Sequence, residues 1–201
     1  IFDEIFLKKN KNQSIDKISF RGQFSKNIKN SDNSVLKVLK VLRKNKIISN
    51  TYTIKIKKKI PVFSGLGGGS SNAATILKFL SNKKIKKNKF NQIINSVGSD
   101  LRLFFYNQGY LKNLNKAVKL RKKNSLHLLI IYPKIKCSTE KVYSMVKNYS
   151  KKELFSQKNT TTKVRLINYL LHSRNDLQSI VEKKHPIIKK LIFNLKKMKG
   201  C

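Results

Sequence analysis

Alternation between apolar and polar positions predicts the strands of this chain. Residues 51–57 alternate with a period of two, which is typical of a strand with one buried face. A second strand-like stretch runs from Ile15 to Phe24. A continuous apolar run at 126–132, ended by Pro133, predicts a buried strand in which we expect His127 to be a packed core residue rather than a ligand.

Helical periodicity accounts for most of the remaining apolar positions. Apolar residues recur every three or four positions in these segments: 33–42, 72–80, 90–97, a segment capped by Thr139, 164–171 and 186–198. Pro186 is at the early position that proline favours in a helix. Helices mixed with strands predict an α+β fold. The periodicity lapses near 112–116, so we expect two domains, at 1–112 and 113–201.

The charge balance points first to nucleic acid. The chain has 46 basic and 9 acidic residues, a formal net charge of +37. However, only six of the basic residues are Arg, the side chain that best forms paired hydrogen bonds to bases and phosphates. The lysines are spread through every predicted element. We therefore expect no specific nucleic-acid partner, only non-specific binding of polyanions at low salt.

Membrane and disulfide-rich classes are excluded by composition. No apolar run approaches the length of a membrane span, and no signal-peptide pattern opens the chain. Two cysteines, Cys137 and Cys201, are too few for a disulfide framework or a zinc site. We expect a cytoplasmic protein without a membrane partner, with Cys137 as a partly buried thiol.

The most informative local feature is a run of glycines between the 51–57 strand and a helix. Residues 65–71 read Gly-Leu-Gly-Gly-Gly-Ser-Ser. Glycines let backbone N–H groups approach a ligand closely, and the N-terminus of the following helix attracts anions. The run therefore predicts a phosphate site. The simpler alternative is a glycine-rich turn whose serines, Ser70 and Ser71, only cap the helix.

Two common phosphate loops do not fit this run. A Walker loop requires Lys followed by Ser or Thr at the helix start, and no Lys is there. A dinucleotide fingerprint requires a third glycine where Ser70 stands, and an acidic residue about twenty positions later. The first acidic residue after the loop is Asp100.

The run instead resembles the phosphate loop of the GHMP kinases, Pro-x-x-x-Gly-Leu-Gly-Ser-Ser. The version here extends from Pro61 through Asn72 and Ala74, and it is most similar to the 4-diphosphocytidyl-2-C-methyl-D-erythritol kinase branch. Further ordered matches run from Asn33 to Pro186: Asn33-Ser34-Val35, Lys58, 98–105 around Asp100, 138–143, Asn175-Asp176-Leu177 and His185-Pro186.

Asp100 also stands out chemically, because it is the only carboxylate between Asp32 and Glu140. A kinase that acts on an alcohol needs a group that accepts or orients the hydroxyl proton. From composition alone, a cap of a short helix by Ser99 and Asp100 is the more favoured interpretation. The resemblance reverses this preference, because the Asp of this motif is catalytic in the family.

The resemblance implies an ATP-dependent kinase that uses Mg²⁺ and phosphorylates the 2-hydroxyl of 4-diphosphocytidyl-2-C-methyl-D-erythritol in isoprenoid biosynthesis. Asp100 would be catalytic, and Thr139 and Tyr143 would border the small-molecule substrate. Ser71 would lie near Mg²⁺. These residues would bind the nucleotide: Pro61, Gly65, Leu66, Gly67, Gly68, Gly69, Ser70, Ser71, Asn72, Asn33 and Lys58.

The resemblance also implies a GHMP-kinase fold. Its N-terminal domain is similar to domain 2 of ribosomal protein S5, its C-terminal domain is ferredoxin-like, and a homodimer is one expectation for its assembly. Two other functions stay open: a GHMP kinase with a different substrate, and a basic nucleic-acid-binding protein that retains the scaffold.

Departures from the family pattern suggest a fragment. The chain lacks the family's N-terminal Ala-Lys-Xaa-Asn-Leu and Gly-Tyr-His segments, and it stops before a Gly-Ser-Gly turn. We therefore expect a chain truncated at both ends, whose isolated 201 residues are close to inactive. Within the chain, Arg102 replaces a usual Pro, Phe63 stands where a small residue is common, and 113–116 replaces a Gly-x-Gly-Glu turn.

Overall fold

A computed structural model describes residues 1–11, 13–26, 28–81, 85–121, 123–147, 149 and 161–198, apart from the side chains of Lys87, Thr139 and Glu140. The chain forms two compact units, Ile1–Leu120 and Arg121–Cys201, which we treat separately. The division falls after a hairpin that belongs to the first unit, whereas the sequence places it at 112. Among the described residues, no helix is long and apolar enough to cross a membrane.

The first unit is built on a three-stranded sheet with the order β1-β3-β2. The strands are β1 (Glu4–Lys9), β2 (Lys17–Arg21) and β3 (Tyr52–Lys57). β3 pairs antiparallel with β1 and parallel with β2. The antiparallel register places Glu4 opposite Lys57, so the beginning of β1 lies beside the end of β3.

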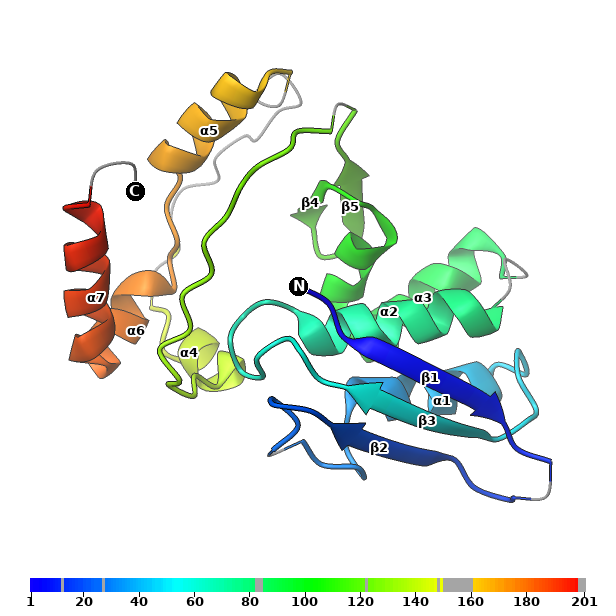
Figure 1. The fold of residues 1–201 in the computed structure, drawn as a ribbon. Helices are drawn as coiled ribbons and strands as arrows, with labels where there is room; N and C mark the ends of the chain where they lie inside the picture. Colours follow the sequence, from blue (N-terminus) through cyan, green and yellow to red (C-terminus); the bar gives the residue numbers. More distant parts are fainter. Residues whose placement is uncertain are drawn as a thin grey trace. The chain divides into compact units, whose positions relative to one another are not determined.

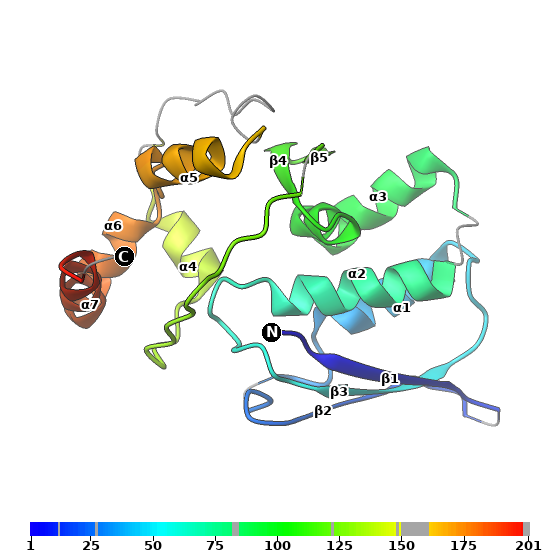
Figure 2. The same ribbon diagram turned by 45° about the horizontal axis from the view of Figure 1, so that its top comes forward.

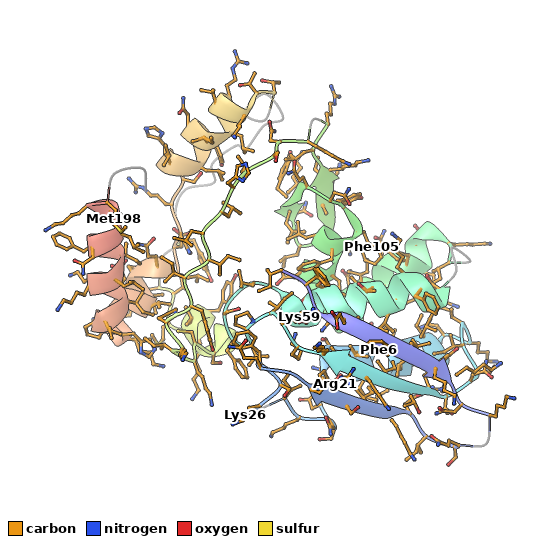
Figure 3. All side chains as sticks on the ribbon, viewed as in Figure 1. Phe6, Arg21, Lys26, Lys59, Phe105 and Met198 are labelled. Carbon is orange, nitrogen blue, oxygen red and sulfur yellow. The ribbon has the colours of Figure 1, made fainter. Side chains whose placement is uncertain are left out.

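Two helices cover one face of this sheet, α1 (Ser34–Lys44) and α2 (Gly68–Ser81), as Figures 1 and 2 show. The alternation along β3 directs Tyr52, Ile54 and Ile56 toward the helices, where they are buried. These side chains pack into one apolar cluster with residues of α1 and α2, including Leu39 and Leu77. Figure 3 shows Phe6 and Arg21 on the sheet, and the Arg21 guanidinium lies 5.5 Å from the centre of the Phe6 ring.

The rest of the first unit extends this core. The elements are α3 (Lys87–Val97), the 3₁₀ helix η1 (Ser99–Phe105), β4 (Gly109–Asn113) and β5 (Lys116–Lys119). Phe90 of α3 meets Phe105 of η1 edge to face, with ring centres 4.9 Å apart. β4 and β5 form an antiparallel hairpin. Leu101 of η1 is buried in the same cluster as the sheet residues, which fixes η1 against the core.

The second unit contains helices only, as far as its residues are described: α4 (Thr139–Ser144), α5 (Lys163–His172), α6 (Gln178–Lys184) and α7 (Pro186–Lys196). α7 has proline in its first turn, as predicted. α4 also forms, but its N-cap is Ser138, which accepts a hydrogen bond from the Lys141 N–H, and not Thr139.

The predicted strand at 126–132 is wrong. These residues form no regular element, and Leu128 and Leu129 are 81% and 80% exposed. A strand requires a hydrogen-bonded neighbour, and the described residues supply none to this run. His127 is therefore exposed rather than packed. The ferredoxin-like character of the C-terminal half stays a prediction.

Candidate functional site

The glycine-rich loop leaves the carboxyl end of β3 and leads directly into α2. Its bend is held by two hydrogen bonds of Ser64, whose Oγ donates to the Pro61 carbonyl at 2.8 Å and accepts from the Leu66 N–H at 3.4 Å. Three residues of the loop have positive φ: Phe63 at 56°, Gly65 at 74° and Gly67 at 68°. A phenylalanine in this left-handed conformation is strained, which gives the departure at position 63 a structural cost.

Two glycines of the loop lie where a side chain would collide. A Cβ on Gly67 would lie 2.5 Å from Cζ of Phe104, a residue of η1. A Cβ on Gly68 would lie 3.0 Å from Cγ2 of Ile60 and 3.2 Å from Nζ of Lys58. The loop therefore packs closely against both η1 and the segment that follows β3. This close packing, which a plain turn would not need, favours the phosphate interpretation.

The N-terminus of α2 has the features of an anion site. The helix begins at Gly68, inside the glycine run, and its first turn contains no acidic side chain. The Ser71 N–H donates to the Gly67 carbonyl at 2.8 Å, so Ser70 and Ser71 lie within the first turn and not at the cap. The backbone N–H groups before Ser71 have no partner within the helix. They can bind a phosphate, which the helix dipole also attracts.

The beginning of α1 contacts this region. Ser34 Oγ donates to the Gly69 carbonyl at 2.8 Å, across 35 positions of sequence. Asn33 is the N-cap of α1: its Oδ1 accepts from the Leu36 N–H at 2.9 Å, and its Nδ2 donates to the carbonyls of Lys29 and Asn30. The structure thus brings the Asn33 motif next to the loop, with the Asn33 side chain occupied in capping.

Asp100 lies in the first turn of η1, and its side chain is exposed. The N-cap of η1 is Gly98, and no side chain caps this helix, so the capping interpretation of Ser99 and Asp100 is wrong. Within the described part of the chain, the Asp100 carboxylate forms no hydrogen bond or ion pair. Because Phe104 of the same short helix packs against Gly67, the element that carries Asp100 is docked on the phosphate loop.

Arg102, which replaces a usual proline, is a buried residue of η1. Its guanidinium donates to the Leu114 carbonyl at 3.1 Å, to Asn91 Oδ1 at 2.8 Å and to Asn95 Oδ1 at 2.5 Å. These acceptors belong to α3 and to the turn between β4 and β5. Arg102 therefore joins three elements, so that the substitution has a structural role in holding η1.

Lys58 is also buried, with 3% of its side chain exposed, and its ammonium is paired with the carboxylate of Asp3. Asp3 was not identified from the sequence. It also accepts hydrogen bonds from the N–H groups of Lys59 and Ile60, at 2.8 and 2.9 Å, and from Asn72 Nδ2 at 2.9 Å. Burial raises the pKa of Asp3, but these hydrogen bonds, that of Lys58 first, outweigh the burial and hold the pKa below its ordinary value.

The remaining predicted residues are those expected near the metal ion and the substrate. No group of three His, Cys, Asp or Glu side chains that could hold a metal ion exists in the described ranges. Tyr143 of α4 is 51% exposed, and Thr139 begins that helix, although its side chain lies outside the described residues. Both belong to the second unit.

Comparisons with known proteins find similar sequences that cover the region of the loop. The family model of the GHMP kinases N terminal domain matches residues 33–106, which hold both the loop and Asp100. A 4-diphosphocytidyl-2-C-methyl-D-erythritol kinase from Pelagibacter ubique is 37% identical over 87% of this chain and 63% of its own length. The enzyme of that name from Buchnera aphidicola is 35% identical over 84% of this chain and 58% of its own. The chain thus spans about three fifths of these relatives.

Solved structures show the same fold. A homoserine kinase from Cytophaga hutchinsonii superposes with a TM-score of 0.54 at 16% identity, over 74% of this chain and 52% of its own. A 4-(cytidine 5'-diphospho)-2C-methyl-D-erythritol kinase gives a TM-score of 0.54 at 17% identity, over 94% of this chain and 67% of its own. The family model, the relatives and the solved structures thus agree that this chain is similar to the GHMP kinases, with residues 33–106 matching the N-terminal domain of that family.

Proposed function

We propose that the protein transfers the γ-phosphoryl group of ATP to the 2-hydroxyl of 4-diphosphocytidyl-2-C-methyl-D-erythritol. The observation that carries this proposal is the glycine loop at the end of β3, which opens into the N-terminus of α2 and packs against the 3₁₀ helix that bears Asp100. The names of the relatives support the choice of substrate.

Each group of site residues has its own role in this reaction. Gly67, Gly68 and the first turn of α2 bind the phosphates through backbone N–H groups and the helix dipole. The Ser71 hydroxyl, together with those phosphates, would hold Mg²⁺, which would supply neutralisation of their negative charge. Asp100, which is exposed and unpaired among the described residues, orients the alcohol or accepts its proton. Thr139 and Tyr143 border the substrate. Catalysis of this kind depends mainly on positioning and charge neutralisation.

The test is a phosphoryl-transfer assay on the full-length protein with ATP, Mg²⁺ and 4-diphosphocytidyl-2-C-methyl-D-erythritol. We expect turnover, and we expect Asp100→Asn to lower kcat by about 10²–10⁴-fold. Asp32→Asn is the matched control: Asp32 is an exposed carboxylate of the same unit, 3.6 Å from Lys37 Nζ, and its loss should leave kcat unchanged.

The choice of substrate needs its own measurement. In a thermal-shift assay, we expect cytidine diphosphate ligands to raise the melting temperature of the protein and mevalonate to leave it unchanged. Stabilisation by mevalonate would reassign the protein to another GHMP kinase class. Full activity of Asp100→Asn would exclude the proposed role of this carboxylate.

A further inference from the structure

Asp3 lies where three segments that are distant in sequence meet. It directly precedes β1, and the register that pairs Glu4 with Lys57 places it at the end of β3, where the glycine loop begins. Its side chain is 1% exposed. Its four hydrogen-bond donors come from Lys58, Lys59, Ile60 and Asn72, so one carboxylate contacts both ends of the loop.

The two carboxylate oxygens have different partners. Oδ1 accepts from the backbone N–H groups of Lys59 and Ile60, just before the loop. Oδ2 accepts from the Lys58 ammonium and from Asn72, in the second turn of α2. Oδ1 therefore holds the entry of the loop, and Oδ2 connects Lys58 at the entry to Asn72 at the exit. Lys59, labelled in Figure 3, also pairs with Glu4 at the start of β1.

The charge of Lys58 is directed at the loop as well. Its Nζ lies 3.2 Å from the position that a Cβ of Gly68 would occupy, beside the first residue of α2. A buried ammonium without a partner is strongly unfavourable, and here the partner is Asp3. Because Asp3 neutralises it, the ammonium can stay next to the positive end of the helix.

We propose that Asp3 is a positioning residue for the nucleotide: together with Lys58 it fixes the two ends of the glycine loop, so that the loop is already shaped for a triphosphate before ATP binds. This inference rests on the proposed function for its ligand. It assigns Lys58 an indirect role, through Gly68, in place of a direct contact with the nucleotide. A loop shaped in advance does not have to be ordered when ligand binds, which lowers the cost of binding.

The experiment measures the dissociation constant of AMP-PNP with Mg²⁺ by calorimetry on the full-length protein. Asp3→Asn keeps the acceptor for Lys59 and Ile60 but turns an amide NH₂ toward Lys58 and Asn72, which are both donors. We expect Asp3→Asn and Lys58→Met each to raise Kd about tenfold, as the loss of a supporting partner typically does. The double variant should be no weaker than either single variant, because the pair acts as one unit.

Asp16→Asn is the control for a loss of stability alone. Asp16 is similarly buried, with 6% of its side chain exposed. It binds a cation, Arg43 at 3.0 Å, and a backbone N–H, that of Tyr52 at 2.9 Å, but at the opposite end of β3. We expect this variant to lower the melting temperature and to change Kd less than twofold. If Asp3→Asn does not fold, Asn72→Ala removes one of the four bonds and should raise Kd about threefold.

Each outcome decides the question. An unchanged Kd in Asp3→Asn or Asn72→Ala overturns the positioning role. Additive losses of about a hundredfold in the double variant overturn the paired action and favour a direct contact between Lys58 and phosphate. If wild-type protein binds AMP-PNP but phosphorylates no alcohol, the proposed function is contradicted. The Kd values of the variants relative to wild type can still be measured in that case. Wild-type protein that does not bind AMP-PNP overturns both.

Discussion

At the scale of single residues, Phe63 is the most strained position of the site. Its φ of 56° costs a residue with a Cβ about 1–2 kcal/mol. The side chain is 48% exposed, so packing offsets little of this cost. We predict that Phe63→Gly raises the free energy of unfolding by about 0.5–1 kcal/mol, after the entropy that glycine adds to the unfolded chain. Phe63→Ala, which keeps the Cβ, should not stabilise. Equal stability of both variants in urea unfolding would contradict the strain.

Asp3 makes the stability of the fold depend on pH in a defined direction. Its pKa is below the ordinary value of 3.8 in the folded chain, so the native state favours the carboxylate. The stabilisation is therefore complete above about pH 5 and is lost as pH falls through 3.8 toward the lower folded pKa. We predict that wild type and Asp3→Asn differ more in free energy of unfolding at neutral pH than at pH 3, which is below the ordinary pKa of 3.8. Urea unfolding at both pH values measures this, and a constant difference would refute it.

Asp3 is an example of a site residue that sequence patterns do not identify. Asp100 could be found because it is isolated among cations and belongs to a motif. Asp3 has no local pattern, and its position is defined only when β1 pairs with β3, which is distant in sequence: Glu4 lies opposite Lys57. The spacing of residues within a motif carries no information about such pairing. The sequence thus predicted the loop but not the carboxylate that holds it.

At the scale of elements, the contact between η1 and the phosphate loop depends on Gly67. Gly67→Ala would place a Cβ 2.5 Å from the Phe104 ring and strain a φ of 68°. Gly65→Ala is a matched control, since Gly65 has a similar φ of 74° but no neighbour within 4 Å of a Cβ. We predict that both variants lose about 1–2 kcal/mol of stability from backbone strain. Because only the Cβ at Gly67 meets Phe104, Gly67→Ala should weaken AMP-PNP binding about tenfold more than Gly65→Ala does. Calorimetry compares the two, and equal Kd values would argue against the contact.

Periodicity predicted the elements that bury one face on the core. The segments of α1, α2, α3 and β3 all form close to their expected bounds, because their apolar stripes meet in one cluster. The strand predicted at 126–132 does not form, because an apolar run indicates burial but does not identify a partner strand. β1 and the β4–β5 hairpin were not predicted: their burial alternates weakly, and their pairing is set by neighbouring strands.

At the scale of the whole molecule, the two units differ in their interior. The buried apolar cluster lies entirely within the first unit, from Ile18 to Leu101. In the second unit, Val142 and Leu166 are the buried apolar residues among those described. A segment with so little buried apolar area opens at a low free energy and is cleaved first by a protease.

We therefore predict that limited proteolysis of the chain leaves a resistant fragment close to Ile1–Leu120. Trypsin suits this test, because lysines are spread along the whole chain and cleavage then reports opening rather than the availability of sites. Mass spectrometry should find early cuts after Arg121 and Lys123, and late cuts within α2 and α3. AMP-PNP should slow cleavage after Lys58 and Lys59, which lie just before the loop, and should leave the cuts beyond Leu120 unchanged. Early cleavage inside α2 would mean that the glycine loop is not supported by a stable core.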